Sequence, residues 1–398
     1  MPRPAFLPAM GIVSALGEGR SKVAAQLFSG AHKGMRWRDD LLTDGSGTYV
    51  GEVSGNFPGV PSSLSMYESR NFQLVIAAAA QIRADIDTAV ERYGPARIGV
   101  VMGSSTSGID RGEAALAVVE KSGRLPAGFD IRTQELGSVG EGLACYLGLA
   151  GPAYTISTAC SSSAHALAAG RRMLASGIVD IVIAGGADTL CRLTLNGFQA
   201  LSALSSELCN PFSANRSGIN IGEGVALFLM QREESEIALW GVGSSSDGHS
   251  MTAPQPDGVG IERAVRAALE DASCEAGDID YVQLHGTGTE QNDLVESKVI
   301  QRVFTGGVPA SSSKAQIGHT LGAAGAMGAA HCWLAADAAN EEGFLPPHIW
   351  DGVGADGLLS DTLVAPGNRL PSLARRLFLT NAFAFGGNNA CLVIGRQA

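Results

Sequence analysis

The chain has 398 residues, of which 45% are hydrophobic and 17% charged, and it carries a formal net charge of −11. This composition excludes the disordered and collagen-like classes and indicates a globular protein with a large core. The acidic balance argues against a nucleic-acid-binding protein, which needs a basic surface. Because one core seldom serves so long a chain, we expect two domains or two fused halves.

Seven cysteines are scattered along the chain, without a C-x-x-C pair and without Cys/His spacing typical of zinc ligands. An odd number in this arrangement predicts reduced thiols, a cytoplasmic location and no structural metal. Residues 321–336 carry almost no charge but are mostly alanine and glycine. This segment is too weakly apolar for a membrane span, so we expect a buried helix and no membrane insertion.

In the first part of the chain, apolar runs and helical spacing alternate, while residues 20–65 show little periodicity. Short apolar or β-branched runs bounded by glycine predict buried strands, and apolar residues at three- and four-residue steps predict helices. Strands are expected at 11–17, 97–102, 154–157, 178–184 and 225–231, and helices at 69–90, 112–121 and from Cys160 to Gly177.

The same alternation recurs after the polar segment Arg232–Ser235, which we take as the boundary between halves spanning 1–235 and 236–398. Such alternation predicts an α/β protein with covered sheets, and its recurrence suggests two related halves. Strands are expected at 238–242, 281–284, 308–312, 376–380 and 390–394, and helices at 261–272, 294–304 and 321–336.

Cys160 lies where the strand at 154–157 is followed by a helix rich in small residues. The unpaired N–H groups and the positive dipole end of a helix N-terminus favour a thiolate, which is the nucleophilic form of cysteine. The alternative is a buried structural cysteine, which is a common fate of a free thiol. The local pattern alone leaves both interpretations open.

Three further stretches have compositions that core packing does not demand. His285-Gly-Thr-Gly-Thr289 directly follows a predicted strand, Lys314-Ala-Gln-Ile-Gly-His319 precedes the Gly/Ala helix, and Asn381-Ala-Phe-Ala-Phe-Gly-Gly-Asn388 lies between the last two strands. Each could be dismissed singly, because a lone histidine after a strand is more often a core residue than a catalyst.

Together with Thr158-Ala-Cys-Ser-Ser162, these motifs resemble, in the same order, those of the β-ketoacyl-acyl carrier protein synthases of the thiolase-like superfamily. The resemblance covers nearly the whole chain. It implies a five-layered α/β/α/β/α fold of two similar halves, and a reactive triad of Cys160, His285 and His319. It further implies supporting roles for Lys314, Asp293 and Glu296, an oxyanion hole from the backbone N–H groups of Cys160 and Phe385, a gate at Phe383 and Phe385, and contacts of Thr287 and Thr289 with phosphopantetheine.

The implied reaction is a decarboxylative Claisen condensation of malonyl-carrier protein with a Cys160-bound acyl group, in fatty acid, polyene or polyketide biosynthesis. A thiolate and an oxyanion hole suit acyl transfer, and two imidazole donors can stabilise the enolate without a metal. No cofactor is expected, because phosphopantetheine enters as the arm of the acyl carrier protein. The resemblance also implies a homodimer, or a heterodimer with a chain-length-factor-like paralogue.

Several positions depart from the usual family pattern. Ala384 replaces a glycine between the two phenylalanines, and the segment after His285 looks more like type II polyketide or aryl polyene ketosynthases. Thr106 is expected to line the acyl pocket, or alternatively to hydrogen-bond within its own loop. Arg70 and Arg216 are candidate docking residues for the acidic carrier protein.

Two alternatives compete with a ketosynthase. A biosynthetic thiolase has a similar fold, but similar thiolases carry a second cysteine near the position where Phe385 stands. A non-catalytic chain-length-factor-like subunit resembles the family but lacks the nucleophile, whereas Cys160 and both histidines are present here.

Overall fold

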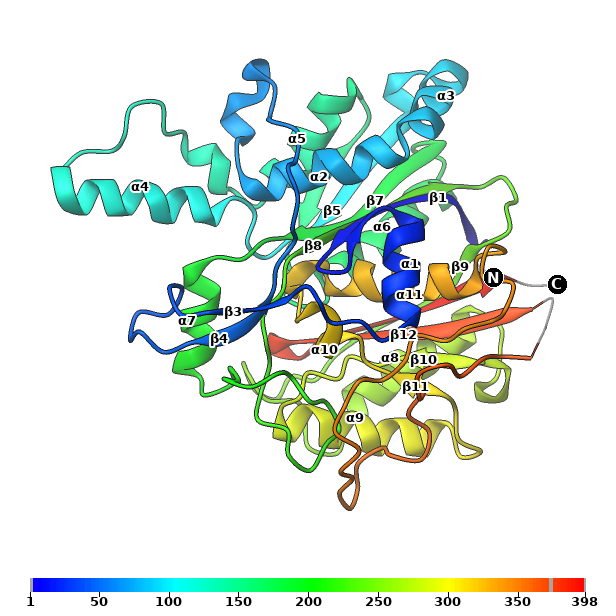
Figure 1. Ribbon diagram of the computed structural model, residues 1–398. Helices are drawn as coiled ribbons and strands as arrows, with labels where there is room; N and C mark the ends of the chain where they lie inside the picture. Colours follow the sequence, from blue (N-terminus) through cyan, green and yellow to red (C-terminus); the bar gives the residue numbers. More distant parts are fainter. Residues whose placement is uncertain (1–2, 372–374, 397–398) are drawn as a thin grey trace.

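The computed structural model describes residues 3–371 and 375–396. Eleven strands form one continuous sheet, whose order is β11-β10-β12-β13-β9-β1-β8-β7-β5-β6, with β2 paired to β1. Strand β1 joins the two sides, because it pairs along its length with β8 and at Ala5 and Phe6 with β9 (Figure 1). The sheet is thus divided into two halves that meet at β1 and β9.

The two halves have the same strand pattern. Counted outward from the junction, the first two pairings of each half are antiparallel and the next two are parallel. Because consecutive parallel strands need crossover connections, both halves carry helices on their faces. The strands of the first half are β1 Ala5–Ser14, β2 Gly17–Glu18, β5 Ile98–Gly103, β6 Ala153–Ile156, β7 Ile181–Asp188 and β8 Gly224–Gln231. Those of the second half are β9 Ala238–Ser246, β10 Tyr281–Gln283, β11 Ala310–Ser311, β12 Arg376–Ala384 and β13 Asn388–Arg396.

Helices form three layers around the two halves of the sheet (Figure 1). One outer layer holds α2 Arg70–Gln81, α3 Arg83–Tyr93 and α5 Ser138–Leu147, and the other holds α8 Val259–Asp271 and α9 Glu290–Val303. The middle layer holds α6 Ser162–Ala175 and α11 Ala324–Ala336. This is the five-layered α/β/α/β/α arrangement that the resemblance implies.

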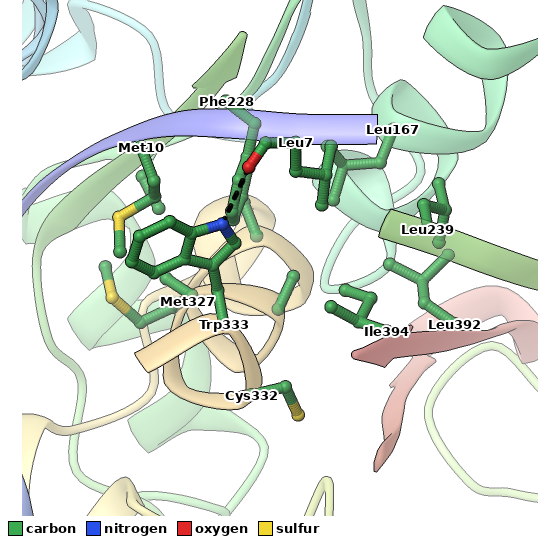
Figure 2. Close-up of a cluster of buried hydrophobic side chains, with 14 of the residues drawn as sticks. Leu7, Met10, Leu167, Phe228, Leu239, Met327, Cys332, Trp333, Leu392 and Ile394 are labelled. Carbon is green, nitrogen blue, oxygen red and sulfur yellow. Dashed lines mark hydrogen bonds between the residues drawn. The ribbon is translucent and has the colours of Figure 1, made fainter. Parts of the chain in front are cut away.

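The middle layer contains a core shared by both halves. Trp333 of α11 donates from Nε1 to the Leu7 carbonyl at 2.9 Å, among side chains from both halves (Figure 2). A methyl group on Gly325 would lie 2.6 Å from the Ala164 nitrogen, so α11 packs closely on α6. The expected buried helix at 321–336 is confirmed, and it begins with the 3-10 turn Leu321–Ala323. In the part of the chain that the structure describes, no helix is long and apolar enough to cross a bilayer.

Other expectations require correction. Residues 20–65 contain α1 Arg20–Phe28 and the hairpin β3 Met35–Arg38 with β4 Thr48–Gly51. The single helix expected at 69–90 is two helices, because Ile82 leaves helical geometry at φ −117°. Strand β1 starts at Ala5, before the range 11–17 expected from the sequence, and it includes Pro8. Pro8 lies where the register between β1 and β8 is irregular, so the strand tolerates its missing N–H. Further helices are α4 Ile109–Ser122, α7 Arg192–Ala200 and α10 Lys314–Ile317, with 3-10 turns Ser62–Tyr67, Pro95–Arg97, Ile131–Gln134, Ala276–Asp278 and Phe385–Gly387.

Candidate active site

Cys160 lies in a tight turn between β6 and α6. Ala159 has φ +51°, a strained value for a residue with a side chain, and Thr158 N donates to Ser162 Oγ at 2.9 Å. The Ser161 hydroxyl donates to the Thr158 carbonyl at 2.9 Å. A methyl on Gly103 would lie 2.3 Å from Ser163 N, so β5 packs directly against the start of α6. The turn therefore presents Cys160 in a fixed position in the interior.

The two predicted histidines meet this cysteine from the other half of the molecule. His285 follows β10, and His319 follows α10. Nε2 of His319 lies 3.0 Å from the Cys160 sulfur, and the two imidazole centroids are 5.2 Å apart. All three side chains are buried. The structure thus brings together residues that are as much as 159 positions apart.

Buried charged residues hold the His285 loop. Glu296 accepts hydrogen bonds from His285 N at 2.8 Å, Gly286 N at 2.7 Å and Asn381 Nδ2 at 3.0 Å. The Lys314 ammonium donates to the His285 carbonyl. Burial lowers the pKa of Lys314, with Glu296 acting in the opposite direction, and burial raises the pKa of Glu296. These two side chains support the loop through its backbone.

Asp293 and the two threonines lie at the far end of the same loop. Asp293 accepts from Phe212 N at 2.8 Å and Gly288 N at 3.1 Å, and burial raises its pKa to about 7. The hydroxyls of Thr287 and Thr289 are 2.9 Å apart. Asp293 therefore shapes the loop that carries both threonines.

The side chains of Cys160, His285 and His319 line a narrow cavity of about 20 Å³. It shares Ala203, Thr289, Asn292 and Phe385 with an open depression of about 480 Å³, so the two adjoin at these residues. The cavity is lined by Cys160, His285, His319, Thr287, Thr289, Phe383 and Phe385, together with Phe198, Ala203, Ile219 and Asn292. Phe385 packs against Phe198 with the ring centroids 5.5 Å apart and the ring planes tilted by 43°, so the two aromatic side chains form one wall of the cavity.

The electrostatics of the cysteine differ from the expectation. Burial raises the pKa of Cys160 to about 11, whereas the Lys314 ammonium and hydrogen bonds from the backbone of Phe385 and Cys160 lower it. The expected preference for the thiolate form of Cys160 is therefore wrong. The free energy needed to remove a thiolate from water is larger than the stabilisation that the backbone dipoles of the turn provide. Burial holds the pKa of His285 and of His319 well below the ordinary range, so both imidazoles are neutral.

The expected triad is also the group with metal-ligand spacing in the described ranges. The ligand atoms of Cys160, His285 and His319 lie within 4.8 Å of one another. A thiolate with two imidazoles would suit zinc or another soft divalent ion. Metal-free catalysis therefore stays a prediction, which metal analysis of the purified active enzyme would test.

Three residues lie in settings that differ from their expected roles. Thr106 is fully buried, donates from Oγ1 to Asp188 Oδ1 at 2.8 Å, and does not line the cavity at Cys160. Its contacts favour the second interpretation, hydrogen bonding that supports its own loop. Arg70 pairs with the buried Glu223 and donates to the Val53 carbonyl at 2.8 Å, so it neutralises an interior charge, while its side chain stays 36% exposed. Its docking role stays a prediction. Arg216 is partly exposed at the 480 Å³ depression.

Sequence reasoning missed Asp188, Phe198 and Asn292. Asp188 ends the strand β7 and is fully buried. A single acid that closes the apolar run 181–187 is a signal that could have identified it, because a buried charge needs dedicated partners. Phe198 and Asn292 lie on α7 and α9 and carry no comparable pattern.

Comparisons with known proteins agree with this geometry. Residues 9–236 match the N-terminal domain and residues 237–349 the C-terminal domain of beta-ketoacyl synthase. The chain is 37% identical over 259 residues to Nodulation protein E of Rhizobium meliloti, an alignment covering 62% of each protein. It is 32% identical to 3-oxoacyl-[acyl-carrier-protein] synthase 2 of Vibrio cholerae over 82% of each. The complex of the ketosynthase ApeO with its chain length factor ApeC, from Xenorhabdus doucetiae, contains a similar chain with TM-score 0.93 and 41% identity, covering 99% of this chain and 98% of that one.

Proposed function

Because the chain belongs to the beta-ketoacyl synthase family, we propose that it condenses malonyl-carrier protein with an acyl group held on Cys160, releasing carbon dioxide. The supporting observation is the buried cluster of one thiol and two neutral imidazoles, with His319 Nε2 at 3.0 Å from the sulfur. The retained nucleophile disfavours a non-catalytic chain-length factor. The product belongs to fatty acid, polyene or polyketide biosynthesis.

The first half-reaction transfers the acyl group to the enzyme. His319 Nε2, as a neutral acceptor, takes the Cys160 proton when the sulfur attacks the thioester carbonyl. The tetrahedral intermediate then breaks its bond to the sulfur of the carrier arm, which takes that proton and leaves as a thiol. The backbone N–H groups of Cys160 and Phe385 both lower the pKa of the Cys160 thiol, so they act on the negative charge of the sulfur. The same N–H groups would stabilise the negative oxygen of the tetrahedral intermediate, which forms beside the sulfur.

The second half-reaction needs donors where enolate charge develops. After the first product leaves, the proton of neutral His319 moves from Nδ1 to Nε2 by exchange with water, and His285 and His319 would then each present an N–H to the malonyl thioester oxygen. The malonyl C–C bond breaks, carbon dioxide departs, and the electron pair of that bond forms the enolate. The enolate carbon then attacks the acyl carbonyl, and the Cys160 sulfur leaves as a thiolate and takes a proton from water. Glu296 and Lys314 hold His285 in place through its backbone.

Substrate would reach the sulfur through the depression at Arg216. Thr287 and Thr289 lie along the passage, where hydroxyls can bond the amides of a phosphopantetheine arm. Arg216 is the stronger candidate for docking, because it borders this depression, although its guanidinium also donates to the carbonyls of Ser213 and Glu290. Salt should weaken carrier binding if charge attracts the two acidic proteins.

We also propose a dimer that forms through the edge of the first half. Strand β6 ends the sheet order, so one side of its backbone is unpaired by the sheet, and Tyr154 on it is exposed. Leu116, Val118, Leu125, Ile131 and Leu136 add exposed apolar surface in α4 and the segment after it. The partner is a second copy or a chain-length-factor-like paralogue. Seven unpaired cysteines support a cytoplasmic location and the absence of structural disulfides.

Intact-mass analysis would test this function directly. The protein is mixed with a panel of acyl-loaded carrier proteins, and the adduct on Cys160 is identified by peptide mapping. Malonyl-carrier protein is then added, and carbon dioxide and the ketoacyl product are measured. Loading at another residue, or loading that persists in Cys160→Ala, would contradict the assigned nucleophile.

A further inference from the structure

Asp188 has an unusual set of hydrogen-bond donors for a buried carboxylate. It accepts from the hydroxyls of Ser104 at 2.7 Å, Ser105 at 2.6 Å and Thr106 at 2.8 Å. It also accepts from the N–H groups of Ser105 at 2.9 Å, Thr106 at 2.8 Å and Gly322 at 2.5 Å. An ionised carboxylate is an acceptor only, so this set of donors suits its charged form.

These bonds connect two segments that are far apart in the sequence. Residues 104–106 follow β5, whereas Gly322 lies three residues after His319 in the 3-10 turn Leu321–Ala323. A methyl on Gly322 would lie 2.7 Å from both Asp188 Oδ2 and Ser105 N, so the approach requires a glycine. Leu321, just before it, has φ +50°, and such strain persists where surrounding contacts fix the backbone.

His319 is therefore held on two sides. Before the turn, His319 N donates to the Asn220 carbonyl at 2.7 Å and Gly222 N donates to the His319 carbonyl at 2.9 Å. After the turn, Asp188 fixes Gly322. The start of α11 also binds the start of the nucleophile helix, through Ala326 N and Ser163 Oγ at 2.8 Å.

We propose that Asp188 is a positioning residue for the Cys160–His319 pair, fixing the turn after His319 onto the loop 104–106. The inference rests on the proposed function for its catalytic readout. A second readout, the alkylation of Cys160, does not depend on the proposed function. Burial has the largest effect on the pKa of Cys160, followed by Lys314 and the Phe385 backbone, which lower it, and the negative charge of Asp188 then raises it. The other ionisable groups around the sulfur are Lys314, which lowers that pKa, and the neutral His285 and His319.

Asp188→Asn should change two measurements in opposite directions. Malonyl-thioester decarboxylation should fall about tenfold to a hundredfold, because a misplaced catalytic group loses its orientation. Alkylation of Cys160 by iodoacetamide at about pH 8 should become about twofold to fivefold faster, because losing the nearby negative charge increases the thiolate fraction. A generally destabilised variant would unfold at a lower temperature. Slower decarboxylation and faster alkylation together with an unchanged thermal transition would therefore indicate a specific effect of Asp188.

Ser105→Ala separates the two effects. The Ser105 hydroxyl donates to Asp188 Oδ2 and accepts from Gly322 N at 3.1 Å, so its loss weakens the turn but keeps the charge. Decarboxylation should fall about threefold or more, and the pH dependence of alkylation should stay unchanged. This variant also provides the decarboxylation test if Asp188→Asn does not fold.

Asp280→Asn is the matched control, because Asp280 accepts from Leu377 N at 2.8 Å and is not among the charges that act on Cys160. It should leave decarboxylation and alkylation unchanged. Normal decarboxylation in Asp188→Asn, slower alkylation, or the same paired changes in Asp280→Asn would overturn the inference. If the unsubstituted protein releases no carbon dioxide, the proposed function fails, while the alkylation measurement still tests the effect of Asp188 on Cys160.

Discussion

The nucleophile turn, residues 157–163, and the histidine loops, residues 285–289 and 314–319, are held in different ways. The nucleophile turn is held mainly by hydrogen bonds between residues three or four positions apart, such as Thr158 N to Ser162 Oγ, and one long-range bond joins Ala326 N to Ser163 Oγ at its end. The histidine loops use groups distant in the sequence, including Asn381 bonded to Glu296 and Asn220 bonded to His319. A short segment can specify the position of the thiol, whereas the histidines depend on the assembled interior.

Removing either imidazole should have the largest effect. His285→Ala and His319→Ala should each reduce malonyl decarboxylation by about a hundredfold or more, because each loses a donor to the enolate oxygen. His319→Ala should also load acyl groups onto Cys160 more slowly than His285→Ala, because its Nε2 contacts the sulfur. Carbon dioxide release and intact-mass loading measure the two steps, and equal loading rates would contradict the distinct roles.

The pH dependence of Cys160 alkylation tests the electrostatics of the nucleophile turn. Its pKa of about 11 lies above the ordinary thiol value, so deprotonation requires higher pH. Between about pH 7 and pH 10 the iodoacetamide rate should rise about tenfold per unit, because the thiolate is the reacting form. A plateau near neutral pH would show that the turn and Lys314 outweigh burial. Denatured protein provides the reference rate for an ordinary cysteine.

Paired substitutions compare how the two regions are supported. Glu296→Gln replaces one acceptor oxygen by an NH₂ group facing a backbone N–H, and should lower the free energy of unfolding by about 1 to 3 kcal/mol. Ser162→Ala removes two local hydrogen bonds, one accepted from Thr158 N and one donated to the Ala159 carbonyl, at a cost of about 1 to 2 kcal/mol. Urea unfolding followed by circular dichroism measures both. A larger loss for Ser162→Ala would reverse the comparison.

Thr106→Val should have the smallest effect on catalysis. The substitution keeps the side chain's shape but removes two hydroxyl bonds, one donated to Asp188 and one accepted from Thr189 N, which should lower the free energy of unfolding by about 1 to 2 kcal/mol. Because Thr106 does not line the cavity at Cys160, relative rates with short and long acyl primers should not change. A changed preference between short and long primers would instead show that Thr106 lines the acyl pocket.

The sequence by itself identified the local features and the family. Periodicity located the buried strands and the helix after Cys160, because strand alternation and helical spacing are properties of short segments. The ordered motifs identified Cys160, His285 and His319 as candidates. It did not reveal α1 or the β3–β4 hairpin, whose residues lack a clear period, nor the break at Ile82.

Only the tertiary structure decided how these residues act on one another. Tertiary packing places His319 Nε2 against the Cys160 sulfur. It also forms the ion pair between Arg70 and Glu223 and the hydrogen bond from Thr106 to Asp188. It also reverses the expected ionisation of Cys160, because the free energy of removing a thiolate from water depends on everything that surrounds the sulfur. Neither contacts between distant residues nor desolvation is encoded in the spacing of a local motif.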